Sequence, residues 1–172
     1  MPIEMARGKP RLDILTGMGA ASQLADEYDG IMVQVIELAE SCSDEDWQVS
    51  CAPEERTVGV VFDHIAKGNP QVVLWVNEFL AGRPVPLTSE ELNARNADHA
   101  RGAAHRPRAE TVQELRDGSK TTSKAIRSLT EPQLRQSQEF AWAGRQEVAW
   151  VASTALRHPR GHLKSIREAL GR

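Results

Sequence analysis

Four long segments of the chain repeat apolar residues every three or four positions, and this period constrains the fold more than any other feature. Such spacing places the apolar side chains on one face of an α-helix. The segments span residues 12–39, 57–80, 109–129 and 146–170. No Asn-Gly or Asp-Gly pair stands between alternating apolar runs, so the sequence carries no β-hairpin signal. We therefore predict an all-α chain with four long helices.

The connection between the second and third predicted helices is unusually long. Residues 82–108 contain three prolines and no sustained apolar period, although residues 91–100 are compatible with a short helix. A helix over residues 57–80 is about 36 Å long, and the extended connection reaches about twice that distance. The connection can therefore cross the whole bundle and let the second and third helices run parallel. This arrangement is an up-down-down-up four-helix bundle.

Individual residues refine the predicted helices. The inner face of the first helix is marked by Leu24, Tyr28, Ile31, Val35 and Leu38. Thr57 is predicted to cap the second helix, because its hydroxyl can accept a hydrogen bond from a free backbone N–H. Pro70 lies inside the second helix and is expected to bend it. Residues 41–56 are polar and are predicted to form a connection with one helical turn near residues 44–47.

Composition narrows the class of protein. The 172 residues suffice for a single domain over residues 1–172, and 40% hydrophobic with 26% charged residues is typical of soluble globular proteins. The net charge of -3 provides no basic field to attract nucleic acid or an anionic membrane. The sequence has no apolar run of about 18 residues, no signal-peptide core and only two cysteines. A cytoplasmic protein without nucleic-acid or membrane partners is therefore expected.

Three histidines interrupt the predicted inner faces. His158 and His162 are four residues apart, so a continuous helix presents both on one side, with Cβ atoms about 5–6 Å apart. Two imidazoles at this spacing can bind one metal ion, and His64 on the inner face of the second helix can supply a third ligand. Three neutral imidazoles with an open fourth position form a catalytic zinc-type site. Alternatively, each histidine is singly hydrogen-bonded within the core.

Several motifs also follow one another in an order typical of a known family. An acidic stretch ending at Trp47 precedes Thr57, which opens the helix that carries His64; the turn AGRPVP, the segment ELNARNADHA and the motif HPRGHLKSI then follow. Over residues 24–170 this pattern resembles the DinB-like superfamily, also called YfiT-like, of metal-dependent hydrolases and thiol transferases. Related members include the N-terminal domain of mycothiol-dependent maleylpyruvate isomerase and bacillithiol transferases.

The resemblance implies an up-down-down-up bundle and a divalent metal, zinc or nickel, held by His64, His158 and His162. It further implies that the metal activates a low-molecular-weight thiol or water toward a small-molecule substrate. A metal-dependent thiol S-transferase or hydrolase is therefore the first functional hypothesis. The second is a metal-free bundle that binds or sequesters a small molecule, or that acts through interactions, for example as a homodimer.

Two residues depart from the pattern of the family. Pro159 stands directly between two candidate ligands and disfavours helical geometry. If it kinks the helix, the two rings splay and the site is weakened, which favours the metal-free hypothesis; if it only tilts the last turn, the site survives. Arg56 stands where the family often has an aromatic residue before the helix-opening threonine. Asp63 points about 100° away from the neighbouring histidine, which favours a surface position or a supporting role. His99 and His105 lie in the crossover and are expected to be solvated loop residues.

Overall fold

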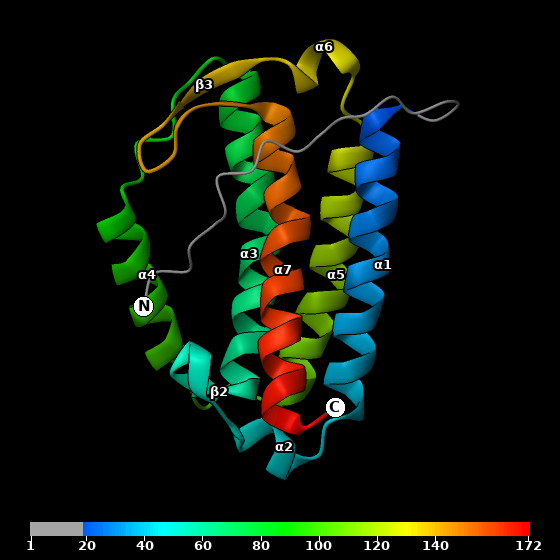
Figure 1. The fold of residues 1–172 in the computed structure, drawn as a ribbon, viewed down its shortest axis with the longest axis vertical. Coiled ribbons are helices and arrows are strands. Elements are labelled where there is room, and N and C mark those ends of the chain that lie inside the picture. The colour runs from blue at the N-terminus through cyan, green and yellow to red at the C-terminus, as the bar shows by residue number, and fades with distance from the viewer. Residues whose placement is uncertain (1–18) are drawn as a thin grey trace.

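The computed structural model describes residues 19–172, so the part of the first predicted helix that precedes residue 19 lies outside the described residues. Most of the described chain is α-helical, which confirms the all-α prediction. Four long helices run side by side along the molecule (Figure 1). They are α1 (Ala20–Ser41), α3 (Val58–Leu80), α5 (Arg108–Arg127) and α7 (Val148–Leu170). Within residues 19–172, no helix has both the length and the apolar character needed to cross a bilayer.

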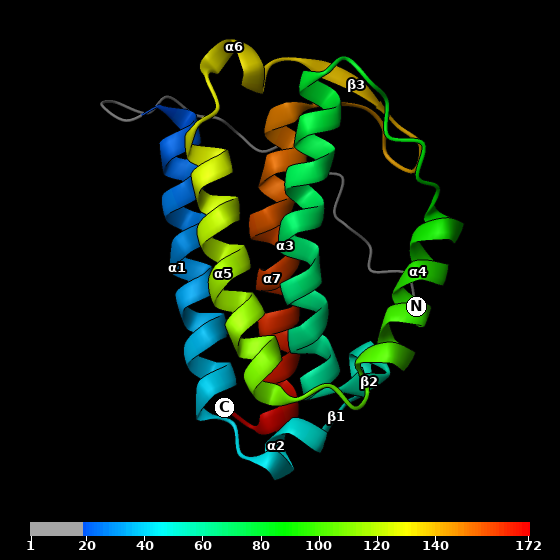
Figure 2. The same cartoon turned by 180° about the vertical axis from the view of Figure 1, so that it is seen from behind.

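The four long helices pack as a square in cross-section. Both α1 and α3 contact α5 and α7, so α1 and α3 occupy diagonal positions. Followed by colour in Figure 1, α1 and α7 run from top to bottom, whereas α3 and α5 run from bottom to top. Figure 2 shows α3 and α5 side by side from behind. Because these two neighbours point the same way, the chain between them must return along the full length of the bundle.

Polar side chains cap the N-termini of several helices. The Thr57 hydroxyl accepts a hydrogen bond from the backbone N–H of Val60 at 3.4 Å, which confirms the predicted cap of α3. Ser43, Thr88 and Thr130 each form a capping box, in which the side chain at the third helical position bonds back to the cap. The helices that they open are α2 (Asp44–Gln48), α4 (Ser89–Ala103) and α6 (Glu131–Leu134).

The buried face of α1 differs from the prediction. Tyr28 and Val35 are fully buried as expected, but Leu24, Ile31 and Leu38 are only partly buried. The buried face is completed by residues that periodicity of large side chains does not reveal, namely Ala21, Ala25, Met32 and Ala39. Alanine lets a neighbouring helix approach closely, so a position can be central in the core without being strongly hydrophobic.

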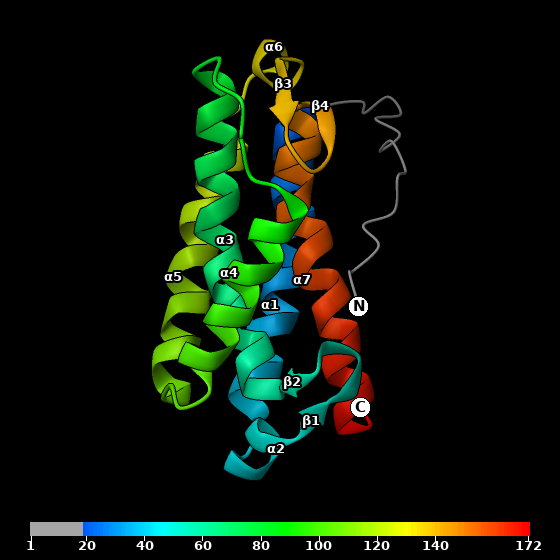
Figure 3. The same cartoon turned by 90° about the vertical axis from the view of Figure 1, so that its left-hand side faces the viewer.

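The crossover contains more helix than predicted. Helix α4 has 15 residues, whereas the sequence suggested a short helix within residues 91–100. Its capping box explains the early start, since the Thr88 backbone N–H donates to the Glu91 carboxylate at 2.8 Å. Only Ala103 of α4 is buried, so this helix lies on the outside of the bundle, beside α3 (Figure 3).

Two short antiparallel ribbons interrupt the helical chain, so the expectation of a chain without hairpins is wrong. Their strands are β1 (Ser50–Cys51) with β2 (Arg56–Thr57), and β3 (Ser137–Phe140) with β4 (Gly144–Glu147). The β3–β4 hairpin has a three-residue loop followed by Gly144 at a φ of 71°, a positive value that this kind of loop needs. Its aromatic residues hold it against the bundle, because Phe140 is buried and packs against Trp142 and Trp150. Packing against residues that are distant in sequence therefore stabilises this hairpin.

Candidate metal centre

The three histidines singled out by the sequence come together inside the bundle. His64 comes from α3, and His158 and His162 come from α7. One ligand nitrogen from each lies within 4.8 Å of the other two. The Nε2 atoms of His64 and His158 are 2.9 Å apart. His64 and His158 are half-buried and His162 is buried, so the cluster is largely shielded from solvent while part of it stays accessible.

Pro159 does not separate the two histidines of the last helix. Helix α7 continues without interruption from Val148 to Leu170, with Pro159 buried inside it. The ring centroids of His158 and His162 are 4.6 Å apart. Of the two alternatives, the one in which the site survives is therefore the one observed, and the buried residues of α7 on both sides of Pro159 keep the axis helical despite the missing hydrogen bond.

Gly68 provides the space that the His158 ring occupies. It lies four residues after His64 on α3 and therefore on the same side of that helix. A Cβ atom added at Gly68 would lie 2.6 Å from Cε1 and 2.9 Å from Nδ1 of His158, closer than side chains pack. The glycine thus lets a ring from α7 reach across to α3.

The surroundings keep two of the imidazoles neutral. Burial lowers the pKa of His64 from 6.5 to about 3, with further contributions from the nearby His162 ring and Arg56 guanidinium. Burial also holds the pKa of His158 well below 6.5, assisted by the adjacent His162 and His64 rings. Neutral imidazole is the form that binds metals, so both rings are ready to act as ligands at neutral pH.

Glu54 supports the cluster from outside it. Its Oε1 atom lies 2.9 Å from Nδ1 of His162, so the Nδ1–H donates to the carboxylate and Nε2 keeps its lone pair for a ligand. Burial would raise the pKa of Glu54, but the hydrogen bond from His162 lowers it below 4.5. The sequence offered no signal for this contact, because Glu54 is 108 positions away in a polar connection.

The donor set fits a divalent metal ion. It combines three convergent imidazoles, two of them held neutral, with a carboxylate that orients the third. Structural and catalytic zinc sites share this combination of histidine ligands and hydrogen-bonded support.

The comparison with known families agrees with this geometry. A family model described as the DinB superfamily matches residues 32–166, a range that includes all three histidines. The chain belongs to the DinB superfamily. Comparisons with curated proteins and with solved structures found no match.

In this DinB superfamily member, Asp63 anchors the crossover to α3. It is buried and accepts hydrogen bonds from His99 Nε2 at 2.8 Å, Arg106 Nη1 at 2.7 Å and the Thr111 hydroxyl at 2.9 Å. Burial would raise the Asp63 pKa, yet these hydrogen bonds and the Arg106 charge lower it to about 2. His99 is therefore not a solvated loop residue, and its ring centroid lies 5.7 Å from that of His64.

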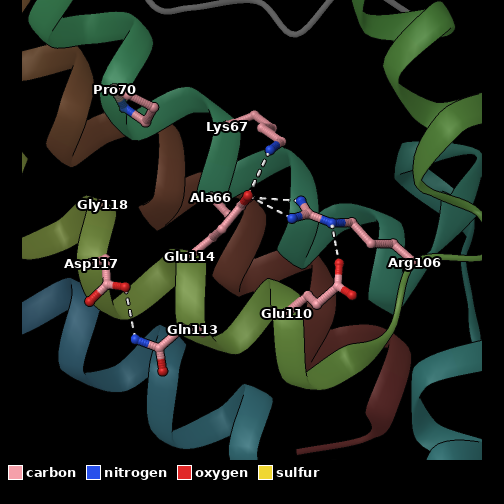
Figure 4. A pocket seen from close by; sticks show the side chains of 9 residues that line it. All are labelled: Ala66, Lys67, Pro70, Arg106, Glu110, Gln113, Glu114, Asp117 and Gly118. Atoms are coloured by element: carbon pink, nitrogen blue, oxygen red, sulfur yellow. Dashed lines mark hydrogen bonds and ion pairs between the residues drawn. The ribbon is translucent and has the colours of Figure 1, made fainter.

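A separate hollow between α3 and α5 contains charged groups that already satisfy one another (Figure 4). Its volume is about 430 Å³, and Glu114 lies at its centre. Lys67 Nζ lies 2.8 Å from one Glu114 oxygen, and Arg106 Nη2 lies 2.6 Å from the other. Both cations are thus paired within the protein, and the lining carries more carboxylates than cations, so neither cation is free to bind an anionic ligand. The free cysteines Cys42 and Cys51 are both buried.

Proposed function

We propose that this DinB superfamily member is a divalent-metal-dependent enzyme of the thiol S-transferase or hydrolase kind. His64, His158 and His162 would hold the ion, with zinc or nickel as the expected metal. One observation carries the proposal, namely that three imidazoles from two helices converge within 4.8 Å while burial keeps two of them neutral. The family membership supports it independently.

The chain's own residues prepare the site for this chemistry. Glu54 fixes the orientation of the His162 ring, and Gly68 admits the His158 ring beside His64. Together these contacts orient ligands from helices that meet only in the folded protein. When bound, the metal would lower the pKa of an approaching thiol or water and so supply a nucleophile at neutral pH.

The up-down-down-up topology implied by the family is part of the same proposal. The directions of α1, α3, α5 and α7 in Figure 1 support it, as does the crossover that carries α4 from the end of α3 to the start of α5. This topology brings α3 and α7 into contact, and these are the two helices that carry the histidines.

The main argument for the metal-free alternative is not supported by the geometry of α7. It rested on Pro159 separating the last two histidines, whereas α7 is continuous and their ring centroids are 4.6 Å apart. The Nε2 atoms of His64 and His158 are 2.9 Å apart, so one ring donates its Nε2–H to the other, and a shift of that proton to Nδ1 would leave both Nε2 lone pairs for an ion.

Metal analysis tests the proposal directly. Untagged protein is incubated with zinc or nickel, freed of excess metal and analysed by mass spectrometry for bound ion. We expect one equivalent in the wild type and in the control His105→Ala, but a clear deficit in His162→Ala. Failure of the wild type to retain metal under replete conditions, with no change in melting temperature on adding chelator, would instead support the metal-free bundle.

A further inference from the structure

A second hollow lies at the start of α3, on the N-terminal side of His64. It has a volume of about 600 Å³ and opens between β2, the first turn of α3 and the end of α4. Its charged lining residues are Arg56, Arg101, Arg106 and Glu55. Three arginines thus line this hollow together with one glutamate, although Arg106 also lines the hollow between α3 and α5, where its guanidinium is bound to Glu114.

The three arginines differ in whether a carboxylate of the protein already pairs with them. Arg106 is held by Asp63 and Glu114, and Arg101 is paired with Asp98. Among residues 19–172, no carboxylate oxygen lies within 4.0 Å of the Arg56 guanidinium, although Glu54 is near enough to feel its charge. Arg56 is half-buried, so its charge is partly removed from water without a direct partner. A guanidinium in that position favours an incoming oxyanion.

The same hollow ends one helical turn from His64 on α3. Thr57 and Val60 line it, and His64 follows Val60 by four residues on the same side of α3, one turn further along. A molecule held by Arg56 would therefore extend along this face of α3 toward the histidines.

We propose that Arg56 binds a carboxylate group of the substrate in this hollow, so that the enzyme acts on small carboxylate-bearing molecules. The inference rests on the proposed function, because it assigns the substrate class of the same site. The planar guanidinium can pair with both carboxylate oxygens, which would orient the rest of the molecule toward the histidine cluster. Arg56 is a binding and positioning residue in this scheme and takes no part in bond making.

Two thiols of similar size test the inference with metal-loaded protein. Cobalt(II) replaces the metal, and the thiolate-to-cobalt absorption band reports binding of 3-mercaptopropionate or neutral 2-mercaptoethanol. We expect wild-type protein to bind the carboxylate-bearing thiol about tenfold more tightly, the scale of one charge-assisted contact. Arg56→Met should bring this ratio close to one and leave the affinity for 2-mercaptoethanol unchanged. Arg101→Met, on the other side of the hollow, should keep the wild-type ratio.

A titration without metal separates this inference from the proposed function. Succinate is added to chelator-treated protein at low salt, and the amide resonances of Thr57 and Val60 are followed by NMR. Saturable shifts in the wild type and their loss in Arg56→Met would support the carboxylate site even if the histidines took up no cobalt. Cobalt binding with an unchanged thiol preference in Arg56→Met would overturn the inference and leave the proposed function standing. Melting temperatures of all variants verify folding.

Discussion

Replacing Gly68 with alanine tests how the bundle makes room for its histidines. The new methyl group would lie 2.6 Å from His158 Cε1, where ordinary contact begins at 3.4 Å, so the ring must retreat by about 0.8 Å. Metal–ligand distances tolerate shifts of only about 0.2 Å. We therefore expect Gly68→Ala to lose at least tenfold in zinc affinity, comparable to the loss of a supporting residue in other sites.

Stability provides a second readout with a matched control. Alanine is favoured over glycine in a helix interior by about 1 kcal/mol, and Gly30 in α1 is exposed with nothing within 4 Å of an added Cβ. Gly30→Ala should therefore raise the melting temperature by about 3 °C. In Gly68→Ala the same gain is opposed by an overpacking cost of about 1–3 kcal/mol, so the metal-free variant should melt at or below the wild-type temperature.

Zinc affinity is measured by competition with a chromophoric chelator, and stability by thermal unfolding of chelator-treated protein. Gly30→Ala should bind zinc as the wild type does. The reasoning fails if Gly68→Ala keeps wild-type zinc affinity and is stabilised as much as Gly30→Ala. That result would mean that the His158 ring can move aside without losing its place in the cluster.

Three further predictions concern the residues around the cluster. Glu54→Gln should weaken zinc binding about 10- to 100-fold in the same competition assay, whereas Glu55→Gln should not. In chelator-treated protein, the pKa of His64 is about 3 in the folded chain and 6.5 in the unfolded chain. Between these two values, only the unfolded chain therefore takes up a proton at His64. Urea unfolding should therefore show this group removing about 2–3 kcal/mol of stability between pH 7 and 4.5, and His64→Gln should show a shallower pH dependence. Asp63→Asn should cost about 2–4 kcal/mol and raise amide hydrogen exchange in α4; unchanged exchange there would contradict its anchoring role.

Part of the candidate site could be predicted because it is local. His158 and His162 are four residues apart on one helix, so their shared side follows from helical geometry alone and survives Pro159. His64 could be placed on the inner face of α3 by the apolar residues around it. Neither argument could pair the two helices. The motif order supplied that step, since it resembled a family in which these histidines act together.

Other parts could not be predicted because they depend on contacts between distant segments. Glu54 reaches His162 only after the β1–β2 ribbon has folded back against α7, and nothing in its polar surroundings marked it out. His99 was expected in a solvated loop, yet the buried Asp63 carboxylate draws it and α4 onto α3. The β3–β4 hairpin lacked a sequence signal because aromatic packing around Phe140, rather than a two-residue turn, stabilises it.

The sequence by itself determined the four amphipathic helices and the presence of histidines on their inner faces, because side-chain direction in a helix repeats with a fixed period. Only the tertiary structure decided which groups surround those histidines. It brought Glu54 to His162, left room at Gly68 for His158 and placed Arg56 without a close carboxylate partner among the described residues at the mouth of a hollow. Such contacts join segments distant in sequence, and their formation depends on how whole helices pack, which no local pattern encodes.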